Sequence, residues 1–287
     1  MPFEYLKTIL IAIAEGITEW LPVSSTGHMV LLENLFPITA MSEAFYAMFL
    51  YVIQFAAILA VIVHFFSRLN PFSPKKTAAE KKNTWHTWLA VLIGVLPAAI
   101  IGLLLDDWVE AYVVSSDIGV FVIAAALIIY GVLYVLLEHF HRSVSFRVEL
   151  PEDLTPRDAL YIGLFQCLSI IPGTSRSGST ILGARLLGVS RVAAAEYSFF
   201  MAIPIMTGVS LLKIGKFALR AVENTPGYAC STDELLLLLV GSVVAFFVSL
   251  LCIRFLVDFV RRHSFACFGW YRIVLGVIVI LYFSLCR

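Results

Sequence analysis

The sequence predicts an all-α integral membrane protein, and three of its features lead to that fold class. Hydrophobic residues make up 60% of the 287-residue chain, charged residues only 14%, and the mean hydropathy is +0.92. Soluble domains carry about 25% charged residues, so this chain must expose much of its surface to lipid. Its apolar residues gather in segments close to the ~20 residues that a helix needs to cross a bilayer. The formal net charge is +0 and no segment carries a basic stripe, which argues against a nucleic-acid partner.

Six segments are predicted to span the membrane as helices. Pro97 and Pro204 lie inside two of them, where a proline kinks the helix and neighbouring helices offer partners to the freed carbonyls. The predicted spans are residues 45–66, 88–105, 118–137, 192–212, 235–257 and 268–285.

Two further segments, residues 6–36 and 159–188, are long enough to cross but are interrupted by a polar loop. The first loop begins Pro22-Val-Ser-Ser-Thr-Gly, and the second begins Pro172-Gly-Thr-Ser-Arg-Ser-Gly. Non-helical backbone is tolerated at membrane depth only where protein buries it or water reaches it. Each segment is therefore predicted to fold as a re-entrant helix–loop–helix hairpin.

The two hairpins also reveal an internal repeat. Each half of the chain holds one hairpin followed by three spans, so each half crosses an odd number of times and the halves lie antiparallel. The prediction is one membrane domain built from an inverted repeat, residues 1–145 and 146–287, with its site near the midplane. An offset of 150 positions pairs Pro22 with Pro172, Ser25 with Ser175, Phe49 with Phe199 and Gly119 with Gly269.

A basic loop predicts the orientation. Residues 68–82 carry five Lys or Arg residues against one glutamate, which places this loop in the cytoplasm. Asp106, Asp107 and Glu110 then lie outside, and the basic pair at 261–262 lies inside. The N-terminus is predicted to start outside.

Glu15 and Glu19 lie in the middle of an otherwise apolar stretch of the first hairpin. Four positions apart, they share one helix face, where like charges repel, and each is costly in hydrocarbon. A divalent cation would compensate both, because Mg²⁺ takes one or two carboxylates and completes its shell with phosphate oxygens. The alternative is that they snorkel or pair with Lys7 or Arg176. Their depth favours a metal site for Mg²⁺ or Ca²⁺.

The tip of the first hairpin has the composition of an anion-binding helix start. Ser and Thr are N-cap residues, so a helix is predicted to begin here with free N–H groups and the positive end of its dipole. Ser25 and His28 are three positions apart, close enough for the imidazole to reach the hydroxyl as a base reaches a nucleophile. A capping serine and a buried structural histidine are the alternative.

The tip of the second hairpin repeats this chemistry and adds Arg176, whose planar guanidinium suits phosphate. An arginine at membrane depth needs a partner, although a single glutamate would also satisfy it. Gln54, inside a predicted span, either hydrogen-bonds a catalytic side chain or joins two helices. The predicted substrate contacts are Ser24, Thr26, Gly27, Gln54, Thr174, Ser175, Ser177 and Thr180.

Two strings, EGITEWLPVSSTGH ending at His28 and PGTSRSG beginning at Pro172, closely resemble the undecaprenyl-diphosphate phosphatase family of bacteria, the bacitracin-resistance phosphatases. The similarity covers essentially the whole chain, including VIQ ending at Gln54 and LGVSR ending at Arg191. It implies six spanning helices and two re-entrant hairpins. It also implies removal of the terminal phosphate from undecaprenyl diphosphate, which recycles the lipid carrier of peptidoglycan and cell-wall synthesis. The implied place is the outer face of the bacterial cytoplasmic membrane.

The resemblance also implies a role for each matched residue. Glu15 and Glu19 become the metal-linked acidic pair, Ser25 the nucleophile, His28 the acid/base residue and Arg176 the phosphate clamp. Ser175 and Thr180 become supporting contacts. The chain departs from the family in having Leu50 where members often carry a glutamate, and Trp20, expected to pack, where phenylalanine is usual.

Several alternatives stay open at this stage. His28 could attack in place of Ser25, or water could be activated directly. A carrier for a polyprenyl phosphate or another anion is the rival function, because inverted repeats with midplane hairpins are common in transporters. Membrane lipids are expected partners, and a homodimer is compatible with the sequence.

Overall fold

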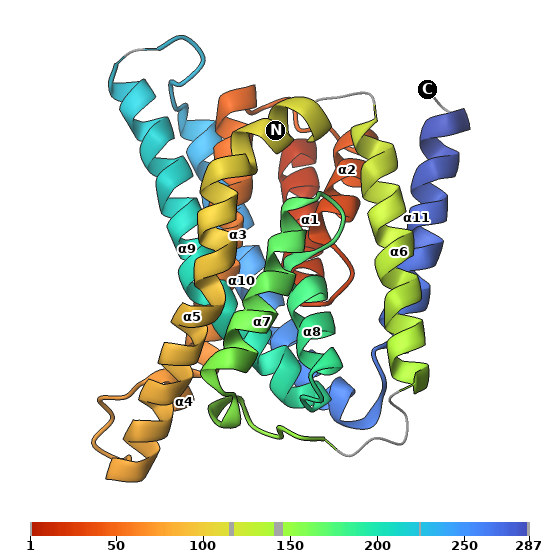
Figure 1. Cartoon of the computed structure of the whole chain (residues 1–287). Helices are drawn as coiled ribbons and strands as arrows, with labels where there is room; N and C mark the ends of the chain where they lie inside the picture. The colour runs from red at the N-terminus through yellow and green to blue at the C-terminus, as the bar shows by residue number, and fades with distance from the viewer. Residues whose placement is uncertain (1, 115–117, 141–145, 224, 286–287) are drawn as a thin grey trace.

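The computed structural model describes residues 2–114, 118–140, 146–223 and 225–285, which fold into helices joined by loops (Figure 1). Within these residues, β-structure is limited to an isolated bridge between Val148 and Val189. Six of the described helices are long and apolar enough to cross a membrane, which confirms the predicted number of spans. They are α3 (Glu43–His64), α5 (Ala78–Val109), α6 (Gly119–Phe140), α9 (Arg191–Val222), α10 (Thr232–Arg262) and α11 (Ala266–Leu285).

Three of these helices extend well beyond the predicted spans. Helices α5 and α9 have 32 residues each and α10 has 31. The apolar run marks where a helix meets lipid, not where its backbone hydrogen bonds end. Helix α10, for example, begins with a capping box in which Ser231 and Glu234 satisfy each other's backbone N–H groups.

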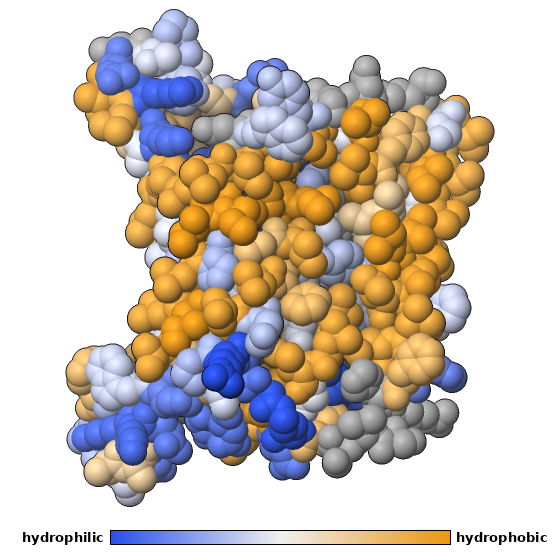
Figure 2. All heavy atoms as spheres, in the orientation of Figure 1, coloured by the Kyte–Doolittle hydropathy of each residue, from blue (hydrophilic) through white to orange (hydrophobic). Residues whose placement is uncertain are grey.

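The outer surface of the molecule is consistent with a membrane protein. Figure 2 shows a broad belt of hydrophobic side chains around the middle of the bundle, with hydrophilic residues gathered at its two ends. The basic loop, residues 68–82, lies at the same end as the C-terminal end of α10 (Figure 1). The side chains of Asp106, Asp107 and Glu110, predicted to lie outside, fall beyond the described part of the chain.

The two interrupted segments fold as helix–loop–helix units. The second helix of each unit, α2 and α8, has 11 residues, so it is about 16 Å long, roughly half the hydrocarbon thickness of a bilayer. In Figure 1 the two units open toward opposite ends of the bundle and their loops lie inside it. This arrangement agrees with re-entrant hairpins, whose depth in a bilayer and antiparallel repeat stay predictions. The first unit is α1 (Pro2–Thr18) and α2 (Ser25–Leu35); the second is α7 (Pro156–Cys167), η3 (Leu168–Ile170) and α8 (Arg176–Leu186).

Spanning helices of each half pack against the hairpin of the other half. Helix α5 packs on α7, and α10 packs on α1 in the same way. Small residues allow this approach: a Cβ added at Gly163 of α7 would lie 2.2 Å from the carbonyl oxygen of Gly94 of α5. Trp20 is fully buried edge-on against Phe199, with ring centroids 5.4 Å apart, which confirms that it packs. The remaining described elements are α4 (Phe66–Leu69), η1 (Glu110–Val114) and η2 (Pro151–Asp153).

Candidate active site

Both hairpin tips start their second helix with the same local structure. Ser24 and Ser175 are the N-caps of α2 and α8, with φ of 72° and 70°, an unusual conformation for residues other than glycine. The Ser24 Oγ accepts from the Gly27 N–H at 3.3 Å, and the Ser175 Oγ accepts from the Gly178 N–H at 3.1 Å. These pairs are related by an offset of 151, so the predicted pairing of Ser25 with Ser175 at 150 is wrong at the tips. The capping serine follows the loop proline by two positions in the first hairpin, Pro22 to Ser24, and by three in the second, Pro172 to Ser175, a difference that the surrounding apolar pattern does not reveal.

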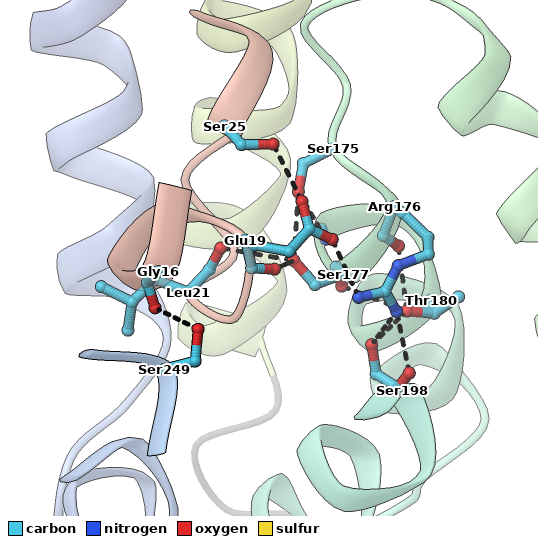
Figure 3. Close-up of polar contacts among 11 residues, drawn as sticks. Gly16, Glu19, Leu21, Ser25, Ser175, Arg176, Ser177, Thr180, Ser198 and Ser249 are labelled. Carbon is cyan, nitrogen blue, oxygen red and sulfur yellow. Dashed lines mark hydrogen bonds and ion pairs between the residues drawn. The ribbon is translucent and has the colours of Figure 1, made fainter. Parts of the chain in front are cut away.

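Glu19 joins the two tips. Its Oε2 accepts a hydrogen bond from the Ser25 Oγ at 3.0 Å, and its Oε1 accepts from the Arg176 Nη2 at 3.2 Å (Figure 3). In the corrected register Ser25 and Arg176 occupy equivalent positions, the first residue of α2 and of α8. The structure thus brings together three of the predicted catalytic residues, and it shows the serine facing a carboxylate.

Arg176 is held on its other side by α9. Its Nη1 donates to the Ser198 carbonyl oxygen at 2.8 Å, and the Thr180 hydroxyl lies 2.7 Å from the Ser198 hydroxyl. The Arg176 Nε is buried and has no hydrogen-bond partner within the described structure. A guanidinium that retains an unused donor can take another acceptor, such as a phosphate oxygen.

The other predicted contacts of the second tip are mostly engaged with backbone. The Ser177 hydroxyl lies 3.3 Å from the carbonyl oxygens of both Glu19 and Leu21, so it ties α8 to the first hairpin. The Thr174 hydroxyl donates to carbonyl oxygens of Leu168 and Ile171 within its own loop. At the first tip, Gly27 is buried and Thr26 is exposed. These residues shape the cradle, and their contact with a substrate stays a prediction.

His28 does not reach Ser25 in this structure, contrary to the pairing that the sequence suggested. Its Nδ1 lies 2.7 Å from the Ser24 carbonyl oxygen, and its Nε2 lies 2.7 Å from the Tyr271 hydroxyl of α11. The two rings are stacked, with centroids 5.6 Å apart. The carbonyl one turn earlier and the distant tyrosine turn the imidazole away from the serine, a direction that a spacing of three cannot specify.

Glu15 is the carboxylate of the site that still has an oxygen without a hydrogen bond. It is 4% exposed, and its Oε1 has no hydrogen-bond partner among the described residues. The Gln54 side chain of α3 lies beside it, and the Glu19 carboxyl is near enough for electrostatic repulsion. Within the described residues no cluster of three or more His, Cys, Asp or Glu side chains could hold a metal. Two carboxylates, one of them with a free oxygen, fit an ion that completes its shell with phosphate and water.

Arg272 of α11 is a residue that the sequence analysis missed. It is fully buried, and its Nη1 donates to the Pro22 carbonyl oxygen at 3.1 Å. Its Nη2 donates at 2.9 Å to the carbonyl oxygens of both Gly173 and Thr174. One guanidinium therefore holds the loops of both hairpins together. Its position inside the predicted span 268–285 could have identified it, because an ionisable residue within a span is a candidate for a functional site.

The sequence of the chain is similar to that of a known protein family. The bacitracin resistance protein BacA family matches residues 8–278 of the chain. The undecaprenyl-diphosphatase of Latilactobacillus sakei is 48% identical over 275 residues, covering 96% of each chain. The undecaprenyl-diphosphatase of Enterococcus faecalis is 46% identical over 276 residues, again covering 96% of each chain. That of Streptococcus mutans is 48% identical over 280 residues, which is 98% of this chain and 96% of its own.

Proposed function

The chain belongs to the bacitracin resistance protein BacA family, and from this membership we propose that it hydrolyses undecaprenyl diphosphate to undecaprenyl phosphate and inorganic phosphate. The observation that carries the chemistry is the placement of Glu19 between the Ser25 hydroxyl and the Arg176 guanidinium. A hydroxyl beside a carboxylate can lose its proton as it attacks, and a guanidinium beside both can bind the phosphate under attack. The product is the lipid carrier that cell-wall synthesis reuses.

The diphosphate binds at the two helix starts. The N–H groups at the beginnings of α2 and α8 and the free donor of Arg176 face a ligand that is rich in anionic oxygens. Charge stabilisation and positioning then supply most of the rate, as is usual in phosphoryl transfer. Glu19 is buried and Arg176 is half-buried, so their electrostatic effect is stronger than it would be in water.

In the proposed reaction the Ser25 Oγ attacks the terminal phosphorus and its proton passes to the Glu19 Oε2. The bond from that phosphorus to the bridging oxygen breaks, and undecaprenyl phosphate leaves. Water then attacks the phosphoserine, the bond from phosphorus to the Ser25 Oγ breaks, and the Oγ takes its proton back from Glu19 as inorganic phosphate is released. The Ser25–Glu19 hydrogen bond of 3.0 Å supports Glu19 as the base in place of His28. Isolating the phosphoenzyme and locating the phosphate on Ser25 or on His28 decides which residue attacks.

We also propose a divalent cation, Mg²⁺ or Ca²⁺, at the carboxylates. Glu15 would hold it through its free Oε1, while both oxygens of Glu19 already accept hydrogen bonds from Ser25 and Arg176. When bound, such an ion neutralises phosphate oxygens. Glu15 is thus the better candidate ligand, and Glu19 the better candidate base.

The proposed location is the bacterial cytoplasmic membrane, with the diphosphate site reached from the outer side. The support is the distribution of charge: the basic loop lies at the end of the bundle opposite to the open end of the first hairpin (Figure 1). An anion carrier is the second candidate function, but a carrier needs no base beside a hydroxyl.

The test uses purified protein in detergent with undecaprenyl diphosphate, following phosphate release with Mg²⁺ and with a chelator. We expect release that falls when the metal is removed, and loss of release in Ser25→Ala and Arg176→Ala. Ser73→Ala, in the basic loop, is the control and should match the unmodified protein. Absence of release from the unmodified protein, with intact substrate binding, would favour the carrier.

A further inference from the structure

A cavity of about 380 Å³ lies at the end of the bundle that carries the basic loop, where hydrophilic side chains gather (Figure 2). Its wall is built from α4, the loop that follows α4, the first turns of α5, η2 and α9, and its volume is in the range of small-molecule binding pockets, about 300–1,000 Å³. On α9 the cavity is lined by Phe200, whereas Ser198, two positions earlier, holds Arg176. Residues two positions apart point to nearly opposite sides of a helix, so α9 separates the cavity from the hairpin tips.

The acidic side chains around this cavity already have partners. The Arg68 Nη1 lies 2.6 Å from the Glu196 Oε2, and the Arg68 Nη2 lies 3.6 Å from the Glu152 Oε2. The Glu80 Oε2 accepts hydrogen bonds from the Thr77 N–H at 2.7 Å and from the Thr77 hydroxyl at 2.8 Å, at the start of α5. The charge of Arg68 is therefore compensated by carboxylates within the protein.

The two lysines of the cavity wall, Lys75 and Lys76, keep unused donors. The Lys76 Nζ donates to the Arg68 carbonyl oxygen and to the Thr84 hydroxyl, both at 2.7 Å, which leaves one of its three N–H groups free. Neither lysine forms an ion pair within the described residues, and the Asn83 side-chain amide in the same wall has no hydrogen bond there. Burial lowers the pKa of the Lys76 ammonium, and the attraction of two nearby glutamates offsets this only in part. The cavity wall therefore offers positive charge and free N–H donors to a ligand.

We propose that this cavity binds a phosphate group through the ammonium groups of Lys75 and Lys76 and the amide of Asn83. Lysine binds phosphate as a point charge, and the amide N–H groups add hydrogen bonds of fixed direction. Phe72 and Trp85, each next in sequence to a wall residue, are 77% and 53% exposed and pack edge to face, with ring centroids 5.7 Å apart. Exposed tryptophan gathers where a membrane meets water, so the headgroup of an anionic phospholipid is the expected source of the phosphate. The site is separate from the proposed hydrolysis and does not depend on it.

Thermal unfolding in detergent measures this binding, because a ligand that binds only the folded protein raises the midpoint of unfolding. Dioctanoyl phosphatidylglycerol should raise the midpoint, and dioctanoylglycerol, which lacks the phosphate, should not. Lys75→Gln should raise the phosphatidylglycerol concentration needed for half of the effect about fivefold, because one charge-assisted contact with phosphate is lost. Lys82→Gln is the matched control: Lys82 is also an exposed lysine of the basic loop, but it is not part of the cavity wall. It should leave that concentration within about twofold.

Two further variants separate this site from general attraction of anions and from the hairpin tips. Asn83→Leu removes the amide without changing the charge and should weaken binding about threefold. Arg176→Ala, which lacks the proposed phosphate clamp of the tips, should keep the response. A response to inorganic phosphate that depends on Lys75, without one to phosphatidylglycerol, would retain the phosphate site and make free phosphate its ligand. Equal weakening in Lys75→Gln and Lys82→Gln, loss of the response in Arg176→Ala, or no response to either phosphate compound overturns the proposal.

Discussion

The two hairpin tips have nearly the same backbone conformation but carry different side chains at the first helical position. Each starts its second helix with a serine cap in the left-handed region, at φ of 72° and 70°, and each cap binds the N–H of a glycine three residues later. The first helical residue is Ser25 at one tip and Arg176 at the other. The tips therefore share their anion-binding backbone and divide the reactive groups between them.

The two carboxylates of the site, Glu15 and Glu19, likewise come from one hairpin. In the register of the tips, an offset of 151 takes Glu19 to Ile170 and Glu15 to Gln166. Gln166 is 1% exposed, and neither of its amide atoms has a hydrogen-bond partner in the described structure. The two similar hairpins thus form one site and not two, because the Glu19 carboxylate accepts a hydrogen bond from the first helical residue of each tip, Ser25 and Arg176.

The largest difference in activity between the two tips is expected when one serine hydroxyl is removed from each. In Ser25→Ala the proposed nucleophile is lost, and we expect kcat for phosphate release to fall on the order of 10³-fold. Ser175→Ala removes a capping hydroxyl of the second tip and should lower kcat by less than about tenfold. Equal losses in the two variants would mean that both hydroxyls act only through the structure of the tips.

Glu19→Gln tests the residue that joins the tips. The amide keeps the shape but cannot accept the proton of Ser25, and it removes the charge opposite Arg176, so kcat should fall on the order of 10²-fold. Glu138→Gln is the matched control: Glu138 is also buried and is paired with Arg185 and Arg191, away from the tips. It should lower thermal stability while the folded protein keeps its kcat. A Glu19→Gln variant with full activity would exclude Glu19 as the base.

The sequence predicts most of the fold and part of the site, for identifiable reasons. The spans follow from the length of apolar runs, and the hairpins follow from Pro22 and Pro172 within such runs, because each signal is local. The intramembrane charges Glu15, Glu19 and Arg176 are likewise visible because hydrocarbon penalises them. The structure then places the last two in contact.

What the sequence could not predict depends on contacts between distant segments. His28 is directed by Tyr271, 243 positions away, and the spacing to Ser25 carries no information about that partner. The one-residue difference between the tips lies in loops without periodicity. Arg272 was visible as a charge within an apolar span, but its role was not, because its partners are backbone carbonyls that no sequence motif marks.

Arg272→Lys tests whether catalysis depends on the relative position of the two hairpin tips. Lysine keeps the positive charge but lacks the planar fork that reaches Pro22 and Gly173 at once. We expect roughly a tenfold lower kcat with a nearly unchanged KM, because the tips lose their relative position. Arg185→Lys is matched in burial, at 1% exposed against 0%, but its carboxylate partner is Glu138. Both variants should lose thermal stability, and only Arg272→Lys should lose kcat; equal kcat in the two would assign Arg272 a purely structural role.

The smallest expected effect concerns the backbone that the tips share. In Ser24→Gly the cap hydroxyl is lost but a residue suited to φ of 72° is gained, so the stability measured by thermal unfolding in detergent should change by less than about 0.5 kcal/mol. Ser24→Ala loses the same hydroxyl and keeps the strained conformation, which should cost about 1 kcal/mol. The same ordering is expected for Ser175→Gly and Ser175→Ala, since the two caps have the same geometry. If alanine equalled glycine at one tip only, the left-handed cap would matter at the other tip alone, and the two backbones would not be energetically equivalent.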